Sequence, residues 1–188
     1  MKRVFAAIDI PLSARNSAAR HIASLRMKFA GHKIGWVRPD NLHLTLKFFG
    51  DVADIQLEKI EEVIAVAADE FEPFKFEIAG TGVFPNRRRP RVLWLGIENP
   101  QTLQRVAAML DLQCEQIGFP PEKRPFHPHL TIARIREPER SGIVADEHLC
   151  SEFESNECWA RDIVLYQSVL GPDGSTYTRL RSFAFAKS

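Results

Sequence analysis

A chain of 188 residues with 45% hydrophobic and 26% charged side chains is long enough to bury a substantial core. This composition excludes an intrinsically disordered segment, a collagen-like repeat and a small disulfide scaffold. The formal net charge of +1 excludes a protein that holds long nucleic acid through its overall field, so any polyanion site must be a local patch.

The cysteines and apolar segments favour a cytoplasmic protein. Cys114, Cys150 and Cys158 are odd in number and lack CxxC spacing, as is typical of reduced thiols. No stretch approaches the ~18 apolar residues that span a bilayer. The apolar run over 4–10 is short and interrupted by Asp9, unlike a signal peptide. We therefore expect a cytoplasmic monomer with no membrane contact.

Hydrophobic patterns predict an α+β protein with no linker. Apolar residues alternate over 42–50, and they recur at helical spacing after Ser13 and Asp54. The strand–helix–strand theme occurs twice, which predicts one domain over 1–188 with two similar lobes. In chain order we expect a strand over 3–10, a helix over 11–31, a strand over 42–50, a helix over 54–71, strands over 74–83 and 91–97, a helix over 100–117, a strand over 129–135, a short helix within 141–153, and a hairpin of 159–170 and 177–185 around 171–174.

The pattern His-x-Thr-x occurs twice, each time on a predicted strand. His43 and Thr45 lie 86 positions before His129 and Thr131. Because side chains alternate along a strand, each histidine projects with its threonine from one face, and the apolar residues between them point into the core. If the two lobes face each other, two imidazoles and two hydroxyls surround one centre.

These side chains suit the hydrolysis of a phosphodiester. The reaction needs a base for the nucleophile and an acid for the leaving alkoxide, and histidine, with an ordinary pKa of ~6.5, can be either near neutrality. Threonine hydroxyls can donate hydrogen bonds to the nonbridging oxygens. Arg134 could add positive charge, but it lies five positions after His129 and reaches the same face only through a bulge or a strand end.

At these residues the chain resembles the 2H phosphoesterase superfamily, and within it the bacterial and archaeal RNA 2′,3′-cyclic phosphodiesterases (LigT-like, formerly 2′-5′ RNA ligases). The similarity runs nearly end to end. It implies a bilobal fold in which two antiparallel sheets flank a central groove and helices pack outside. The segments that carry it are 5–10, 36–37, 41–50, 84–85, 92–96, 126–134 and 165–168, with Tyr177.

The resemblance also implies an activity, the hydrolysis of a 2′,3′-cyclic phosphate to a 2′-phosphomonoester without metal or cofactor. In that scheme His43 is the proton donor to the leaving 3′-oxygen and His129 is the proton acceptor. Thr45 and Thr131 bind the phosphate. The expected partners are RNA ends or nucleotides that carry a 2′,3′-cyclic phosphate, and the reverse reaction would join RNA ends through a 2′-5′ linkage.

Further substrate contacts are expected near the motifs. Phe126, in the loop before the second motif, is the better candidate for stacking on a base, and Tyr166 is another. Phe48 and Trp94 are expected in the core. His127 shares a face with His129 and is expected at the rim of the cleft.

Basic side chains outside the motifs leave two interpretations open. The loop that contains Arg87 and Arg89 is either a solvated turn or a clamp for RNA phosphates. The remaining histidines are expected to face solvent: His21, His32 and His148.

Two other classes of function fit part of the pattern. An RNA- or nucleotide-binding module would keep the cleft without turnover, although a pure binder has no need of two titratable imidazoles. A metal-dependent phosphohydrolase would use His43, His127 and His129 as ligands. Neither threonine would have a role at such a metal and no acidic or cysteine ligand is evident, so we expect no metal site.

Overall fold

The computed structural model describes residues 1–172 and 174–186; Asp173, in the predicted turn of the last hairpin, lies outside the described residues. The strands are β1 (Lys2–Asp9), β2 (Ile34–Trp36), β3 (His43–Val52), β4 (Phe74–Phe84), β5 (Val92–Glu98), β6 (Leu130–Ile135), β7 (Asn156–Ala160), β8 (Asp162–Gly171) and β9 (Gly174–Ala184). The helices are α1 (Leu12–Lys28), α2 (Asp54–Asp69), α3 (Gln101–Glu115) and α4 (Gly142–Cys150), with 3₁₀ turns at Pro39–Asn41 and Pro138–Arg140.

The strands form one curled antiparallel sheet in the order β7-β4-β5-β6-β3-β1-β8-β9, with β2 beside β6. The α+β class is therefore confirmed, but the prediction of two separate sheets is wrong. Leu44 of β3 pairs with Leu130 of β6 and joins a five-stranded half, which includes β2, to a four-stranded half. Pairing removes two edge strands that would otherwise leave backbone groups open to other chains.

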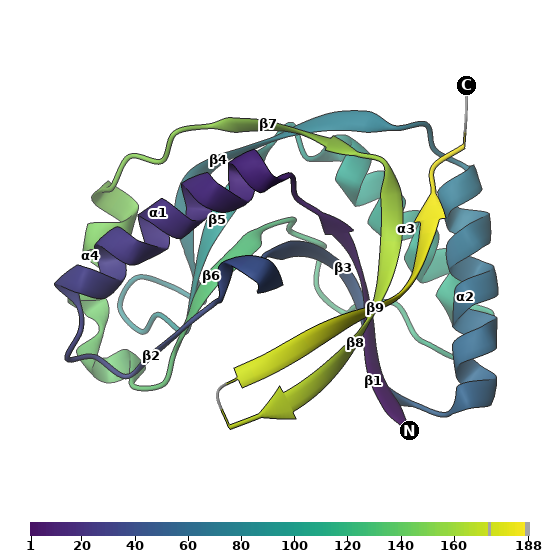
Figure 1. The fold of residues 1–188 in the computed structure, drawn as a ribbon, viewed down its shortest axis with the longest axis horizontal. Coiled ribbons are helices and arrows are strands. Elements are labelled where there is room, and N and C mark those ends of the chain that lie inside the picture. Colours follow the sequence, from purple (N-terminus) through teal and green to yellow (C-terminus); the bar gives the residue numbers. More distant parts are fainter. Residues whose placement is uncertain (173, 187–188) are drawn as a thin grey trace.

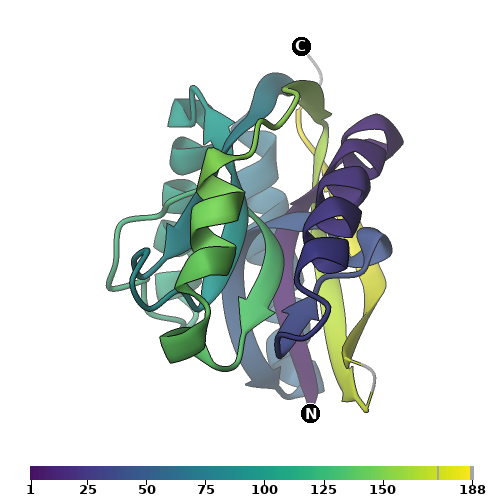
Figure 2. The same ribbon diagram turned by 90° about the vertical axis from the view of Figure 1, so that its left-hand side faces the viewer.

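Helices α1 and α3 each pack against the half of the sheet that does not contain the strand before them in sequence. Helix α1 follows β1 in sequence but packs against β7 and α4, whereas α3 follows β5 but packs against β3 and α2 (Figures 1 and 2). The last hairpin, β8 and β9, lies beside β1 (Figure 1). The two halves of the sheet are thus not successive halves of the sequence. Each half is covered in part by a helix that follows a strand of the other half: α1 covers β7, and α3 covers β3.

The core lies between the helices and the outer face of the sheet. Alternate strand residues such as Ile8, Leu44, Leu95 and Leu130 are at most 1% exposed. Burial of a side chain of this size contributes about 1.5–3 kcal/mol. None of the described helices is both long enough and apolar enough to cross a bilayer.

The predicted strand over 159–170 is wrong, because it is two strands with different neighbours. Residues before Arg161 form β7, which pairs with β4 at one edge of the sheet. Residues after Arg161 form β8, which pairs with β1 in the other half. At Arg161 the chain therefore passes from one half of the sheet to the other. An alternating pattern does not indicate which strand is the neighbour, so the sequence did not predict this passage.

The expectation that His148 faces solvent is also wrong. His148 is completely buried on α4, where its Nε2 lies 3.1 Å from the carbonyl oxygen of Trp94 and its Nδ1 lies 3.1 Å from Nε2 of His21 on α1. Burial lowers the pKa of His148 from 6.5 to about 4. The same cause lowers the pKa of His21.

This buried imidazole makes stability depend on pH. The native protein holds His148 neutral, so the unfolded chain takes up the proton first as the pH falls below 6.5. We expect His148 to cost about 3 kcal/mol of unfolding free energy between neutrality and pH 4. Denaturant unfolding of His148→Gln should show a shallower loss with falling pH, and an unchanged slope would contradict this assignment. His32→Gln is the control.

Candidate active site

The two His-x-Thr-x motifs lie on either side of the Leu44–Leu130 pair. In an antiparallel ladder this pairing sets His43 opposite Thr131 and His129 opposite Thr45. The motifs are therefore related by a local two-fold axis, and each histidine faces the threonine of the other motif. From ordinary strand spacings the two histidine Cα atoms lie about 8 Å apart, on one face of the sheet. The predicted convergence of the motifs agrees with this register.

A bulge follows each motif. Ala7 pairs with Thr45 and Ala6 with Lys47, so Leu46 is an extra residue in β3. Trp94 pairs with Thr131 and Leu93 with Ala133, so Ile132 is an extra residue in β6. Each bulge reverses the alternation of the residues after it.

The two bulges explain where Phe48 and Arg134 lie. Both side chains come to the face that carries the histidines, as the register places Phe48 opposite Phe5 and Arg134 opposite Val92. Phe48 is 59% exposed, so its prediction as a core residue is wrong. Arg134 was expected to reach the face of the second motif only through a bulge or a strand end, and the bulge at Ile132 brings it there.

The backbone holds both imidazoles in the same tautomer. The Nδ1–H of His43 donates to the carbonyl oxygen of Asn41 at 2.7 Å, and the Nδ1–H of His129 donates to that of His127, also at 2.7 Å. In each ring Nε2 is left for chemistry. Nε2 of His43 lies 2.9 Å from Oγ1 of Thr45. Within the described part of the chain, Nε2 of His129 has no protein partner.

Aromatic rings surround both histidines. The ring of Phe5 lies 4.8 Å from that of His43, and Tyr177 meets His43 edge-on at 5.3 Å. Around His129 the ring of Phe84 lies at 5.0 Å and that of Trp94 at 6.1 Å. Trp94 is therefore on the groove face and not in the core as predicted, and its indole lies so close to Gly82 that a Cβ there would be 2.1 Å from it.

Burial lowers the pKa of both catalytic candidates. For His43, the hydrogen bond to Asn41 and the charge of Asp9 oppose this effect, and the charges of Arg134 and His129 add to it. For His129, the hydrogen bond to the carbonyl of His127 opposes it, while the charges of His127 and Arg134 add to it. Arg134 therefore acts on both imidazoles. Without an anion in the groove, the neutral forms are favoured.

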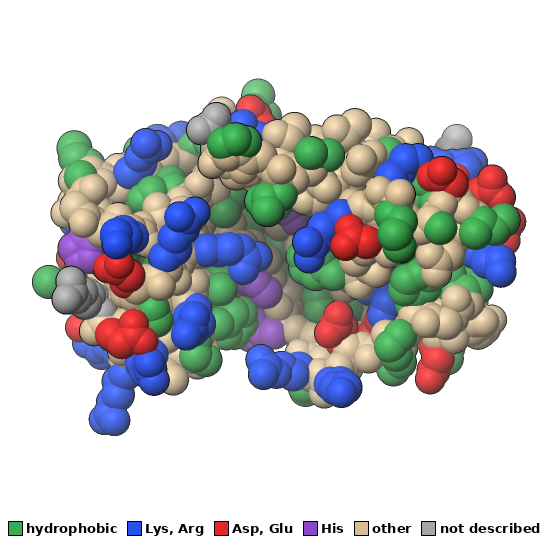
Figure 3. Space-filling view, turned by 90° about the horizontal axis from the view of Figure 1, so that it is seen from below, with side chains coloured by type: hydrophobic (Ala, Val, Ile, Leu, Met, Phe, Trp, Pro, Cys, Tyr) green, Lys and Arg blue, Asp and Glu red, His purple; other side chains and the backbone are tan. Residues whose placement is uncertain are grey.

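The histidines lie in a hollow between the halves of the sheet. In the view from below, histidine side chains line this hollow, Lys and Arg side chains lie around much of its rim, and a few Asp or Glu side chains stand at its right-hand edge (Figure 3). A local cationic rim agrees with the expectation from the low net charge, because a phosphate site on this protein must be a patch.

Two other predicted contacts have partners of their own. Arg87 is paired with Asp146 and Arg89 with Glu139, both on the surface. These carboxylates would have to be displaced before the loop could clamp RNA.

The predicted ring contacts Phe126, His127 and Tyr166 differ in exposure and in their neighbours. Phe126 is half-buried and packs against the hydrophobic core. His127 is exposed, with its ring 5.1 Å from that of Trp94. Tyr166 stacks on Phe5 at 5.3 Å, and burial raises its pKa to about 12.

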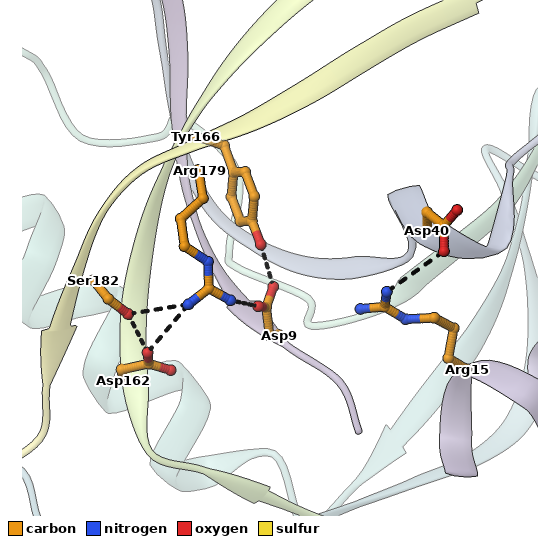
Figure 4. Close-up of polar contacts among 7 residues, drawn as sticks. All are labelled: Asp9, Arg15, Asp40, Asp162, Tyr166, Arg179 and Ser182. Carbon is orange, nitrogen blue, oxygen red and sulfur yellow. Dashed lines mark hydrogen bonds and ion pairs between the residues drawn. The ribbon is translucent and has the colours of Figure 1, made fainter. Parts of the chain in front are cut away.

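Sequence reasoning missed a network beside the first motif (Figure 4). Asp9 pairs with His43 across the ladder and accepts hydrogen bonds from Tyr166, at 2.6 Å, and from Arg179. Asp162 lies 4.0 Å from the other end of the Arg179 guanidinium. Apart from this network, Arg15 of α1 lies 3.8 Å from Asp40 (Figure 4). One signal was available, since Asp9 is an acidic residue inside a strand whose other residues are typical of a buried one.

The three histidines considered as metal ligands do not form a metal-type cluster. Among the described residues, no three or more His, Cys, Asp or Glu side chains are grouped so that they could hold an ion. Nδ1 of both His43 and His129 is already engaged with backbone carbonyls.

Comparison with known proteins agrees with this geometry. A family model described as LigT like phosphoesterase matches the chain twice, over residues 8–94 and 95–177, so each match contains one motif. The chain belongs to this family of LigT-like phosphoesterases.

Curated relatives cover nearly the whole chain. Proteins named RNA 2′,3′-cyclic phosphodiesterase from Methanothermobacter thermautotrophicus and Archaeoglobus fulgidus are 39% and 36% identical, over 96% of this chain and 97% and 99% of their own lengths. A crystal structure of a Thermus thermophilus protein has a TM-score of 0.80 at 28% identity and covers 97% of both chains. Escherichia coli LigT in complex with 3′-AMP has a TM-score of 0.71 at 29% identity and covers 99% of both.

Proposed function

We propose that this protein hydrolyses RNA 2′,3′-cyclic phosphate ends to 2′-phosphomonoesters by acid–base catalysis with two histidines. The observation that carries the proposal is the local two-fold axis that places His43 and His129 on one groove face, each opposite the other motif's threonine. Full-length relatives bearing the name RNA 2′,3′-cyclic phosphodiesterase support it. The complex of Escherichia coli LigT with 3′-AMP supports a nucleotide as ligand.

The proton transfers follow from the state of each ring. The unengaged Nε2 of His129 accepts a proton from water as the water oxygen bonds to phosphorus. The bond from phosphorus to O3′ breaks, and His43 delivers a proton from Nε2 to O3′. Thr45 and Thr131 donate hydrogen bonds to the nonbridging oxygens, and Arg134 compensates their charge.

The empty groove favours neutral His43, yet the proposed acid must carry a proton. A phosphodiester anion between the motifs stabilises the imidazolium and raises its pKa, so substrate binding itself prepares the acid. After hydrolysis His129 holds the proton and His43 has lost one, and exchange with solvent restores the starting state. If the 5′-hydroxyl of another RNA end replaces water, its oxygen bonds to phosphorus, the P–O3′ bond breaks and a 2′-5′ linkage forms, with His129 again the base and His43 the acid. In the return direction O3′ attacks phosphorus, the 5′-oxygen leaves, and the two histidines exchange roles.

A direct assay tests the proposal. Purified protein is incubated with a nucleoside 2′,3′-cyclic phosphate, with and without excess chelator, and the product isomer is identified by chromatography. We expect the 2′-phosphomonoester at equal rates in both samples. Loss of activity in chelator would favour the metal-dependent alternative, and binding without turnover would favour the RNA-binding module.

A surface next to the motifs predicts that RNA length matters. Phe48 lies 5.6 Å from Phe5, which in turn contacts His43. Phe48 also borders an open pocket of about 540 Å³ whose lining includes Lys123 and Arg124. We propose that the nucleotide preceding the cyclic phosphate stacks on Phe48 while these cations meet its phosphate.

Truncating Phe48 should therefore act on long substrates alone. Stacking of a base contributes about 1–3 kcal/mol, so Phe48→Ala should raise KM for an RNA oligonucleotide with a cyclic phosphate end by roughly 5- to 150-fold. KM for the mononucleoside cyclic phosphate should stay the same. Phe48→Trp should retain the discrimination, and Met27→Ala, an exposed site on α1, is the control. Equal losses on both substrates would refute the stacking role.

A further inference from the structure

The local two-fold axis makes the positions next to the two histidines comparable. In the first half Ala7 pairs with Thr45, and Asp9 pairs with His43. In the second half Trp94 pairs with Thr131, and Leu95 pairs with Leu130. Extending that register by one position sets Gly96 opposite His129, the residue that immediately precedes β6. Asp9 and Gly96 are thus equivalent positions.

This equivalence is broken by a carboxylate on one side only. Gly96 cannot carry a side chain without a shift of the backbone, because a Cβ there would lie 2.6 Å from the carbonyl oxygen of Ala79. Asp9, in contrast, is directly across the ladder from His43, where side chains on one face lie about 5 Å apart. Two histidines in matching backbone settings therefore have different neighbours.

Contacts from two neighbouring strands fix the position of the Asp9 carboxylate. Tyr166 of β8 donates to one carboxylate oxygen at 2.6 Å, and Arg179 of β9 donates to the other (Figure 4). Arg179 is itself held on the far side by Asp162 at 4.0 Å. These two bonds, one to each oxygen, fix the orientation of the carboxylate beside His43.

We propose that Asp9 is the positioning residue that makes His43, and not His129, the proton donor. The inference rests on the proposed function and explains how two nearly symmetric imidazoles take opposite roles. A carboxylate beside His43 stabilises its imidazolium form. His129, with Gly96 opposite, has no such neighbour among the described residues and stays neutral, as a base must.

The other charges around His43 do not remove this difference. From β6, Arg134 and His129 lower the pKa of His43, whereas Asp9 from β1 raises it. Arg134 also lowers the pKa of His129, so its charge does not distinguish the two rings. From β9 Tyr177 meets His43 edge-on, and Arg179 donates to the Asp9 carboxylate. From β8, the hydroxyl of Tyr166 donates to the Asp9 carboxylate.

The test is the pH profile of kcat/KM for wild type and Asp9→Asn. The acid must be protonated, so activity falls as the pH rises through the pKa of His43. Removing the negative charge lowers that pKa, so the alkaline limb should move to lower pH. At pH 8 we expect about a tenfold loss, which corresponds to one pH unit of displacement, and activity should recover as the pH is lowered.

Two matched variants separate charge from architecture. Arg179→Gln keeps the Asp9 charge and removes its counter-ion, so the alkaline limb should move to higher pH. Asp162→Asn removes a carboxylate from the same network but not from beside His43, so the limb should stay in place. A loss in Asp9→Asn that is equal at every pH would mean a merely structural role and would overturn the inference.

A second measurement does not depend on turnover. Titration of the histidine ring protons by NMR should give a lower pKa for His43 in Asp9→Asn than in wild type, with His129 changed less. If wild type hydrolyses cyclic phosphate but neither the limb nor the His43 titration moves, Asp9 does not set the roles. If wild type shows no hydrolysis, the proposed function fails, whatever the titration gives.

Discussion

Replacement of either His43 or His129 by alanine is expected to lower kcat/KM on a nucleoside 2′,3′-cyclic phosphate by about 10²- to 10⁴-fold. Each ring is positioned by a 2.7 Å hydrogen bond from Nδ1 to a backbone carbonyl, so Nε2 is presented to the groove in a fixed tautomer. Alanine removes the proton-transfer group and leaves the strands unchanged. Because both rings act in one step, the double variant should lose little more than either single variant.

Two controls make this result specific. His32→Ala, on a segment outside the groove, should retain full activity. His127→Ala should lose less than tenfold, because its ring contacts Trp94 and Phe84 but is not part of a repeated motif. If His127→Ala is as damaging as the other two, the metal-dependent alternative that uses all three histidines gains support. Unchanged activity in either His43→Ala or His129→Ala would refute the mechanism.

Replacement of Arg134 by alanine is expected to lower kcat/KM by about 10²- to 10³-fold, as for removal of one preorganised charge stabiliser. The bulge at Ile132 brings Arg134 to the groove face, and its charge acts on both histidines. Among the described residues no carboxylate lies within ion-pair distance of its guanidinium, so the charge is available to a phosphate. Arg134→Lys should restore part of the activity, since lysine keeps the charge without the planar fork.

The pH profile of Arg134→Ala provides an independent check. A positive charge disfavours protonation of nearby imidazoles, so its loss raises the pKa of both His43 and His129. The acidic and alkaline limbs should both move to higher pH. Arg20→Ala, on an exposed part of α1, is the charge-matched control and should change neither limb. A profile that stays in place while activity falls would remove Arg134 from the neighbourhood of the histidines.

The sequence by itself determined the α+β class and the four motif residues. Alternation over 42–50 and 129–135 requires only that each strand have one buried face, and this property is local. His43 and Thr45, like His129 and Thr131, share a face because they are two positions apart. Repetition of the motif supplied the expectation that the two pairs act together.

Tertiary structure alone decided which residues share the groove with them. The bulges at Leu46 and Ile132 depend on pairing with β1 and β5, and they reverse the faces of Phe48 and Arg134 against simple alternation. The single pair Leu44–Leu130 turned two expected sheets into one. Asp9 meets His43, Tyr166 and Arg179 only through strand neighbours up to 170 positions away along the chain. Pairing between distant strands is set by the fit of the whole core, and local sequence patterns do not record it.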